Sequence, residues 1–366
     1  MPESNLHELS DLGQSVWIDN LTRDSVHKGE LKRLMRDDAV VGVTSNPTIF
    51  QKAISSSESY EEQLKSLTDE TDEAEVFIAL ASDDIRDACD LMRPVWDRTD
   101  GLDGWVSMEV DPTLAYETTK TFEQAKRFFA LIDRPNLYVK IPATVPGLPA
   151  IEDMTAHGKS INITLIFSLD RYKGVVEAYL RGLERLVAAG KDPSVVHSVA
   201  SFFVSRVDTE ADKRLDEAGR PELKGKLAIA NAKLAYQHYL EAFSGPRWEY
   251  LESKGATKQR CLWASTSVKN PDYRDTMYVE QLIGPETVNT MPGETIEAFQ
   301  DHGKVAETLT KGADEATQLL ADLAKAGVDY DDVVLTLEEE GVQKFADSFD
   351  ELLAGIRAKR GELVNA

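Results

Sequence analysis

Eight short apolar runs rich in β-branched residues recur along the chain, and segments with helical spacing separate them. The runs cover residues 15–20, 40–47, 105–112, 137–143, 161–168, 197–205, 260–266 and 286–292. Most of them are not strictly alternating, which is typical of strands buried on both faces of a parallel sheet. A strand followed by a helix, repeated eight times, predicts an α/β fold, the (β/α)8 TIM barrel.

Some stretches between the runs are longer than a single helix requires. We therefore expect additional helices in about 48–104 and 206–259. The acidic end of the chain, about 305–362, carries apolar residues at helical spacing and predicts a helical tail packed on the barrel. Because no repeat, low-complexity linker or break in composition divides residues 1–366, the sequence predicts one barrel domain.

The charge balance limits the partners that this chain can bind. Its 41 basic and 64 acidic residues give a net charge of −23. A field of that sign repels phosphate backbones and anionic membrane surfaces, so we expect neither nucleic acid nor a membrane as partner. An anionic ligand would need a local basic pocket.

Cysteine usage and hydropathy indicate a cytoplasmic location. The chain has two cysteines, Cys89 and Cys261, and no CxxC or Cys/His spacing typical of a metal site. A reducing compartment suits this pattern, and no metal is expected. The sequence also lacks an apolar stretch of the roughly 18 residues that a membrane span needs.

Polar or charged side chains occur near the carboxyl end of most predicted strands. They are Asp19, Asn46, Glu109, Lys140, Asn162 with Thr164, Ser201 with Arg206, Ser265 and Asn289. In a barrel these ends converge on one mouth, which is where active sites of this fold lie. We therefore expect this set to form a site rather than eight independent structural hydrogen bonds.

Lys140 indicates which chemistry the site performs. It lies within the apolar run LYVKIPA, although lysine is rarely buried without a partner. A solvent-exposed lysine is the simpler alternative, and a Schiff-base nucleophile is the other. The second needs a neutral amine, which an apolar barrel interior favours. Asp19 and Glu109 are the carboxylates available for proton transfer. No glycine-rich nucleotide loop is present, so no cofactor is expected.

Six motifs in chain order resemble the transaldolase family of Schiff-base enzymes. They are WIDN, TSNPTIF, VSMEVDP, YVKIPAT, INITLIFS and SFFVSRVD, and the tail LEEEGVQKFADSFDELL is similar to that of the family's longer branch. The resemblance implies transfer of a dihydroxyacetone unit from sedoheptulose 7-phosphate or fructose 6-phosphate to glyceraldehyde 3-phosphate or erythrose 4-phosphate. It also implies the non-oxidative pentose phosphate pathway.

The resemblance further implies a role for each matching residue. Lys140 corresponds to the Schiff-base lysine, and Asp19 to the carboxylate that takes the proton from the substrate hydroxyl during carbon–carbon cleavage. Glu109 and Thr164 correspond to the pair that acts through a bound water. The residues expected to contact the sugar or its phosphate are Asn46, Asn162 and Ser201 for the sugar and Arg206 for the phosphate.

The seventh run departs from the family pattern. The family commonly has a serine and an arginine close together after this strand, whereas this chain has Ser265, Ser267 and Lys269. Ser265 is a reasonable phosphate ligand. Lys269 would act as a point charge without the two-pronged geometry of arginine, or would lie in solvent. Whether Lys269 or Ser267 completes the phosphate site stays open at this point.

Two other functions compete with transaldolase. A fructose-6-phosphate-type aldolase would share the fold and the lysine but release dihydroxyacetone to water. Phe203 bears on this choice, because the resemblance associates a phenylalanine there with transferase behaviour. A noncatalytic barrel that binds sugar phosphates is the second alternative, and the set Asp19, Glu109 and Lys140 argues against it. Because related enzymes are often homodimers, a homodimer is a possible assembly.

Overall fold

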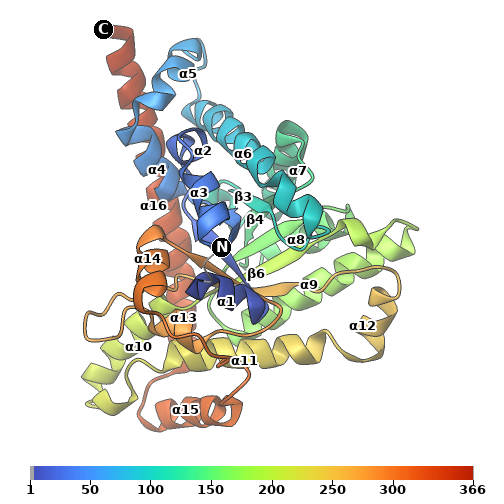
Figure 1. Cartoon of the computed structure of the whole chain (residues 1–366), viewed down its shortest axis with the longest axis vertical. Helices are drawn as coiled ribbons and strands as arrows, with labels where there is room; N and C mark the ends of the chain where they lie inside the picture. Colours follow the sequence, from blue (N-terminus) through green and yellow to red (C-terminus); the bar gives the residue numbers. More distant parts are fainter. Residues whose placement is uncertain (1–3, 366) are drawn as a thin grey trace.

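The structure, a computed structural model, describes residues 4–365 and contains a closed barrel of eight parallel strands in chain order. This confirms the predicted (β/α)8 barrel, which lies at the centre of Figure 1. Every predicted apolar run overlaps one strand. The strands are β1 (Gln14–Asp19), β2 (Val40–Thr44), β3 (Trp105–Glu109), β4 (Leu137–Pro142), β5 (Ile161–Ile166), β6 (Ser198–Phe203), β7 (Arg260–Ala264) and β8 (Thr287–Met291).

Helices surround the barrel, and several lie in the intervals where extra helices were expected. They are α1 (Asn5–Asp11), α2 (Arg23–His27), α3 (Glu30–Asp37), α4 (Pro47–Ser56), α5 (Glu61–Ser66), α6 (Glu73–Arg98), α7 (Thr118–Ile132), α8 (Gly147–Ala156), α9 (Leu169–Ala188), α10 (Ser205–Glu217), α11 (Leu227–Ala242), α12 (Gly245–Glu252), α13 (Met277–Gln281), α14 (Gly293–His302), α15 (Ala313–Lys325) and α16 (Tyr330–Asn365). That the whole chain forms one domain stays a prediction.

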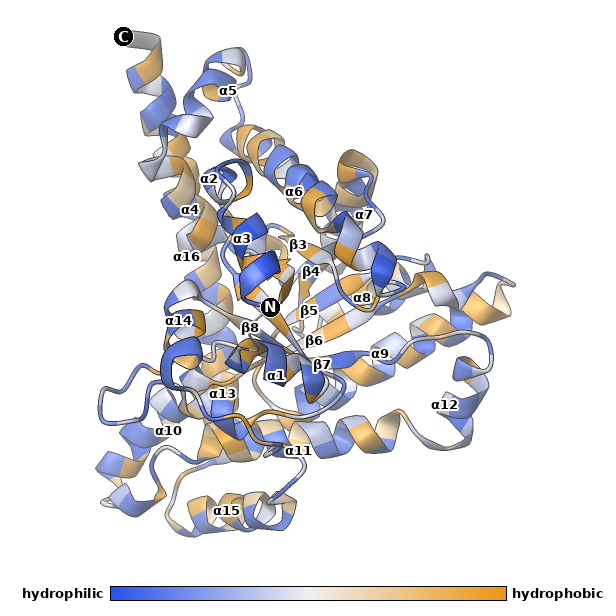
Figure 2. Ribbon diagram, viewed as in Figure 1, coloured by the Kyte–Doolittle hydropathy of each residue, from blue (hydrophilic) through white to orange (hydrophobic). Residues whose placement is uncertain are grey.

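The strands are buried on both of their faces. On β4, Val139 and Ile141 are fully buried and alternate with Lys140, so opposite faces of the strand pack in different surroundings. Figure 2 shows the strands as mainly hydrophobic, while the surrounding helices mix hydrophobic and hydrophilic residues. This double burial explains why the strand sequences do not alternate between apolar and polar residues.

Aromatic side chains fill the barrel interior on the amino-terminal side of Lys140. Trp105 stacks on Tyr138 with ring centroids 4.1 Å apart, and Trp17 lies 6.2 Å from Tyr138. Gly42 on β2 makes room for this packing, because a Cβ atom there would lie 2.4 Å from the Trp17 ring. The aromatic layer closes the interior toward the amino end. The side chains farther along the same strand faces therefore lie nearer the carboxyl end, and they include Asp19, Glu109 and Lys140.

The long C-terminal helix α16 is fixed to the barrel helices along its length. Arg171 on α9 forms a two-pronged ion pair with Glu338, at 2.9 and 3.0 Å. Further along, Thr48 on α4 donates to Ser348 at 2.9 Å. Figure 1 shows α16 and α4 side by side. The predicted tail is therefore part of the wall at the carboxyl end of the barrel.

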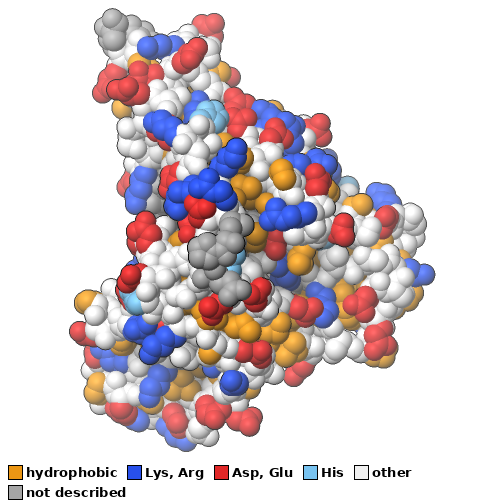
Figure 3. Space-filling view, viewed as in Figure 1, with side chains coloured by type: hydrophobic (Ala, Val, Ile, Leu, Met, Phe, Trp, Pro, Cys, Tyr) orange, Lys and Arg blue, Asp and Glu red, His pale blue; other side chains and the backbone are white. Residues whose placement is uncertain are grey.

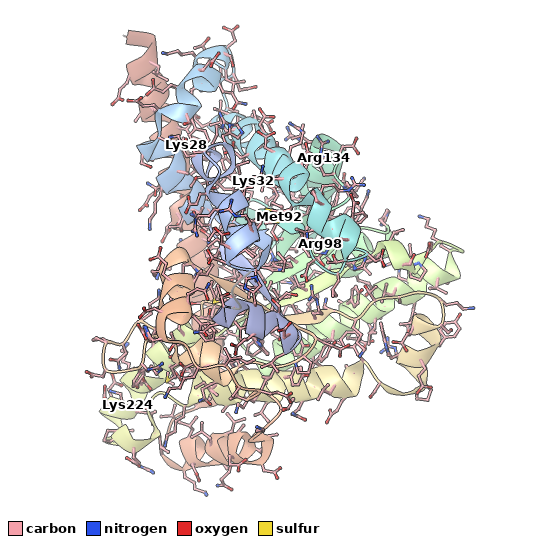
Figure 4. The ribbon with its side chains drawn as sticks, in the orientation of Figure 1. Lys28, Lys32, Met92, Arg98, Arg134 and Lys224 are labelled. Atoms are coloured by element: carbon pink, nitrogen blue, oxygen red, sulfur yellow. The ribbon has the colours of Figure 1, made fainter. Side chains whose placement is uncertain are left out.

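Acidic and basic side chains are interspersed on the face of the molecule in Figure 3. The basic side chains labelled in Figure 4 come from the surrounding helices and loops, not from the barrel strands. Three of them, Lys28, Arg134 and Lys224, form ion pairs with neighbouring aspartates. Within residues 4–365, no helix is long and apolar enough to cross a membrane.

Candidate active site

A cavity of about 910 Å³ opens at the carboxyl ends of the strands, where the polar side chains were expected to meet. Nine of the eleven predicted site residues line it, namely Asp19, Asn46, Lys140, Thr164, Ser201, Phe203, Arg206, Ser265 and Lys269. The other two, Glu109 and Asn162, lie directly behind the lining and contact it. The barrel therefore brings the predicted residues together.

Lys140 lies at the inner end of the cavity. Its residue is only 4 % exposed, and its Nζ atom is 3.1 Å from a carboxylate oxygen of Glu109. The amine also donates a hydrogen bond to the Ser45 carbonyl at 3.0 Å. The pairing of β3 with β4 places Glu109 opposite Lys140, so the register of two parallel strands creates this contact. An amine so enclosed can react with a carbonyl while a carboxylate exchanges protons with it.

The two predicted proton-transfer carboxyls are both perturbed by their surroundings. Burial raises the pKa of Glu109, and the charge of Lys140 opposes this. Burial also raises the pKa of Asp19, while Lys140 and a hydrogen bond from Thr44 at 2.7 Å counteract it. A carboxyl whose pKa moves toward neutrality can both accept and return a proton, which is what acid–base catalysis needs.

Strand β5 bends at the point where Thr164 enters the cavity. Leu165 has a φ of +59°, and the pairing with β6 shifts register between Ile163 and Ile166. Such a backbone is unfavourable for a side chain with a Cβ atom, so the surrounding structure must hold it. The Thr164 hydroxyl has no hydrogen-bond partner in the described part of the chain. Neither oxygen of Glu109 accepts a hydrogen bond from any described group besides the Lys140 amine.

Some of the predicted sugar-binding side chains already form hydrogen bonds within the protein, and others keep donors that a ligand can use. Ser201 donates to Asn162 Oδ1 at 2.6 Å, and the Asn162 amide nitrogen donates to Ser107 at 3.1 Å. Asn162 is thus held in place and supports Ser201 from behind. Asn46 has a second task, because its side-chain oxygen caps α4 by accepting from the Ile49 amide at 3.0 Å. Its amide nitrogen stays available to a ligand.

Arg206 is the half-buried cation of the outer cavity. It lies in the first turn of α10, directly after β6, and donates no hydrogen bond to any residue in 4–365. Its guanidinium lies 5.3 Å from the ring centroid of Phe203 and 5.9 Å from that of Phe345. Burial lowers the pKa of Arg206, and Asp19 opposes this. Free donors on a fixed cation are suited to a phosphate group.

Two predicted phosphate ligands, Ser265 and Lys269, lie in the segment after β7 and differ in how they are held. Ser265 has a φ of +56°, and its hydroxyl is 2.9 Å from that of Ser205. Lys269 is exposed, and its amine donates to the Ser267 hydroxyl at 2.7 Å. Both Ser267 and Lys269 line the cavity. Either Ser267 or Lys269 can therefore complete the phosphate site.

Sequence reasoning missed the part of the cavity wall that comes from helices. Residues on α4 and α16 line the cavity, among them Lys52, Leu337, Gly341, Lys344 and Phe345. Leu337, Gly341 and Phe345 follow one another at intervals of four, which indicates a packed helix face. That spacing does not tell which surface the face packs against, so only the folded chain assigns these residues to the site.

An enclosed lysine beside two perturbed carboxyls, at the carboxyl end of a (β/α)8 barrel, defines an enzyme site. The model of the transaldolase/fructose-6-phosphate aldolase family matches residues 16–356. The chain is 54 % identical to a transaldolase of Frankia alni over 361 residues, which cover 97 % of each chain. It is 51 % identical to a transaldolase of Mycobacterium tuberculosis, over 97 % of this chain and 96 % of that protein. The chain belongs to the transaldolase/fructose-6-phosphate aldolase family, which confirms the resemblance.

Proposed function

We propose that this enzyme transfers a three-carbon dihydroxyacetone unit between sugar phosphates through a Schiff base on Lys140. The donor is sedoheptulose 7-phosphate or fructose 6-phosphate, and the acceptor is glyceraldehyde 3-phosphate or erythrose 4-phosphate, as in the non-oxidative pentose phosphate pathway. The observation that carries the proposal is the buried amine of Lys140, 3.1 Å from Glu109 and open to the cavity. We place the enzyme in the cytoplasm, and a homodimer is a possible assembly.

The first half of the reaction forms the Schiff base. The neutral Lys140 amine attacks the ketone carbon of the donor, and the carbonyl oxygen becomes the hydroxyl of a carbinolamine. Glu109 protonates this hydroxyl through a water held by Thr164, the hydroxyl leaves as water, and an iminium remains. Support for this role comes from Glu109 and Thr164, whose oxygens keep free hydrogen-bonding capacity in the described structure. Raising the pKa of Glu109 makes it a better proton donor near neutral pH.

Cleavage and transfer then use Asp19. Its carboxylate takes the proton from the C4 hydroxyl, the C3–C4 bond breaks, and the bonding electrons move to the iminium to give an enamine on Lys140. The aldose phosphate departs. An acceptor aldehyde then undergoes the reverse steps, and hydrolysis frees the new ketose. The covalent enamine implies ping-pong kinetics, and the route uses only side chains of the chain itself.

Substrate binding uses the outer part of the cavity. Arg206, with its free donors, holds the phosphate, and Ser265 contributes a hydroxyl. Ser201 and the Asn46 amide hold sugar hydroxyls, with Asn162 supporting Ser201. Because the whole chain carries a charge of −23, the local cations determine whether an anionic sugar can enter.

A borohydride trap tests the proposal directly. The enzyme is incubated with fructose 6-phosphate, reduced with borohydride and digested, and its peptides are weighed by mass spectrometry. We expect the mass of a reduced sugar adduct on the peptide that contains Lys140. A chain that binds the sugar and gains no mass would be a noncatalytic binding protein, and an adduct on a different lysine would overturn the assignment.

The same enzyme preparation separates transferase from aldolase. With fructose 6-phosphate alone, a transaldolase holds its enamine, whereas an aldolase releases dihydroxyacetone continuously. Phe203 lines the cavity with an apolar ring next to the Arg206 guanidinium, where it keeps a water-activating hydroxyl out. We therefore expect release of free dihydroxyacetone to be slow without an acceptor, and rapid release would favour the aldolase.

A further inference from the structure

Helix α16 brings an aromatic ring to the cation of the outer cavity. Phe345 is 5 % exposed, and its ring centroid lies 5.9 Å from the Arg206 guanidinium carbon. Phe203 on β6 lies 5.3 Å from the same carbon. The guanidinium is therefore in range of two aromatic rings, one from the barrel and one from the C-terminal helix, and attraction between a cation and an aromatic ring acts over such distances.

The two rings restrict where the Arg206 guanidinium can lie. The guanidinium forms no ion pair or hydrogen bond with another residue of the described chain. A free arginine side chain has many rotamers, and binding an anion then costs the entropy of fixing one of them. Aromatic contacts restrict the rotamers before the anion arrives and leave all the N–H donors free for it.

The position of Phe345 is itself well fixed. The ion pair between Arg171 and Glu338 holds α16 two turns before it, and the hydrogen bond from Thr48 to Ser348 holds the helix just after it. Between them, Gly341 allows α16 to approach the end of β5, since a Cβ atom there would lie 3.2 Å from Leu165 and from Phe167. A ring on this segment cannot easily move away from Arg206.

From this arrangement we infer that Phe345 is a positioning residue for the anion subsite, through which α16 sets the affinity for phosphorylated substrates. The ligand class is a phosphate monoester, and the inference rests on the proposed function. In the proposed reaction, Phe345 does not touch the reacting carbons. It acts through Arg206, so its loss should weaken phosphate binding and leave reaction of unphosphorylated carbonyl compounds at Lys140 in place.

The test compares Phe345→Leu with a matched variant on the same helix. Phe349 lies one turn further along, is also 5 % exposed, and contacts Phe77 at 5.6 Å instead of Arg206. We expect Phe345→Leu to raise the KM for fructose 6-phosphate roughly tenfold, equivalent to about 1.4 kcal/mol. The KM for dihydroxyacetone as donor should change less than twofold. Phe349→Leu should leave the phosphate preference unchanged, and Phe345→Tyr, which keeps the ring, should retain most of it.

A binding measurement keeps the inference independent of turnover. Calorimetric titration of each variant with inorganic phosphate should show roughly tenfold weaker binding for Phe345→Leu than for the parent and Phe349→Leu. Equal weakening in both leucine variants, or none in Phe345→Leu, would overturn the role of Phe345. The borohydride adduct formed with dihydroxyacetone is measured alongside. Its absence from the parent enzyme would refute the proposed Schiff-base function, whereas its presence together with unchanged phosphate binding would refute only the role of Phe345.

Discussion

The two ends of the barrel both enclose charged side chains, but they treat them differently. At the amino end, Arg260 and Asp103 are 8 % and 7 % exposed and form an ion pair at 3.1 Å. Arg260 also donates to Ser15 and to the Leu102 carbonyl, and Asp103 accepts from Ser15 and Trp17. At the carboxyl end, the buried pair of Lys140 and Glu109 has few such additional bonds.

The difference separates a structural network from a reactive one. Charges removed from water cost several kcal/mol each unless partners replace the lost hydration. At the amino end those partners are protein groups, so little bonding capacity remains for a ligand. At the carboxyl end, side-chain oxygens keep unused hydrogen-bonding capacity next to the cavity, where a substrate can bind to them. This contrast predicts that substitutions at the two ends fail in different ways.

The largest effect on activity should come from Lys140→Met. The variant keeps the length of the side chain but has no amine, so we expect transferase activity to fall by about 10⁴-fold or more and the borohydride adduct to disappear. Glu109 then loses its cationic partner, and burial, which raises its pKa, favours the protonated form that needs no such partner. Circular dichroism should report an intact fold. Persistence of the adduct would mean that another residue carries the substrate.

Arg260→Met should produce the opposite pattern at the amino end. It leaves Asp103 buried without its cation, and we expect the free energy of unfolding to fall by about 3–5 kcal/mol, measured by urea denaturation. The folded fraction should still form the Lys140 adduct. Lys28→Met serves as the control, because that exposed lysine should contribute no more than about 0.5 kcal/mol. A small loss of stability together with a loss of adduct would erase the distinction between the two ends.

Arg206→Ala sharpens the comparison within the carboxyl end. Removal of a charged donor from a phosphate contact costs about 1.5–3 kcal/mol, so the KM for fructose 6-phosphate should rise roughly 10- to 100-fold. The KM for dihydroxyacetone should change little. Steady-state kinetics with both donors make the comparison. Equal increases for the two donors would remove Arg206 from the phosphate site.

A pH effect of smaller size is expected from His197, beside Trp105 at the amino end. Burial and the nearby Arg260 charge lower the pKa of His197 from 6.5 to about 4. Above pH 6.5 the imidazole is neutral in both the folded and unfolded chains. As the pH falls from 6.5 to 4, the unfolded chain binds the proton before the folded chain does, so stability is progressively lost. Because His197 is partly exposed, solvent screening limits this loss to about 2 kcal/mol. The difference in unfolding free energy between the parent and His197→Gln should therefore shrink or reverse toward pH 4; a constant difference would contradict the shift.

Much of the fold could be predicted because one local pattern recurs eight times. Each strand is a short apolar run, and the closed parallel order follows from strand and helix alternating in sequence. Because active sites of this fold lie at the carboxyl ends of the strands, the sequence alone also predicted that Asp19, Lys140 and Arg206 lie in one site. Such rules work because parallel strands all point the same way, so the ends of distant strands must meet.

The recurring strand pattern could not predict contacts between residues that are distant in the sequence. Nothing in the run RCLWAST indicates that Arg260 meets Asp103, since Arg260 begins β7 and Asp103 precedes β3, two strands that are not adjacent and that only the closed barrel brings together. The role of Asn46 as a helix cap was likewise concealed by its position in a strand-end motif. The apolar spacing of α16 predicted a packed helix, but its packing surface depends on Gly341 and on anchors in α4 and α9.

The sequence by itself determined the barrel and the family, and it singled out Lys140 as the proposed Schiff-base lysine, because these depend on short motifs and on residue order. The tertiary structure decided how the site is closed. It placed Phe345, 139 residues beyond Arg206 in the chain, beside that arginine. It also surrounded the Arg260–Asp103 pair with hydrogen-bond partners, while the oxygens of Glu109 and Thr164 keep bonding capacity for a ligand. Contacts of this kind depend on the packing of surfaces that are distant in sequence, for which no local pattern exists.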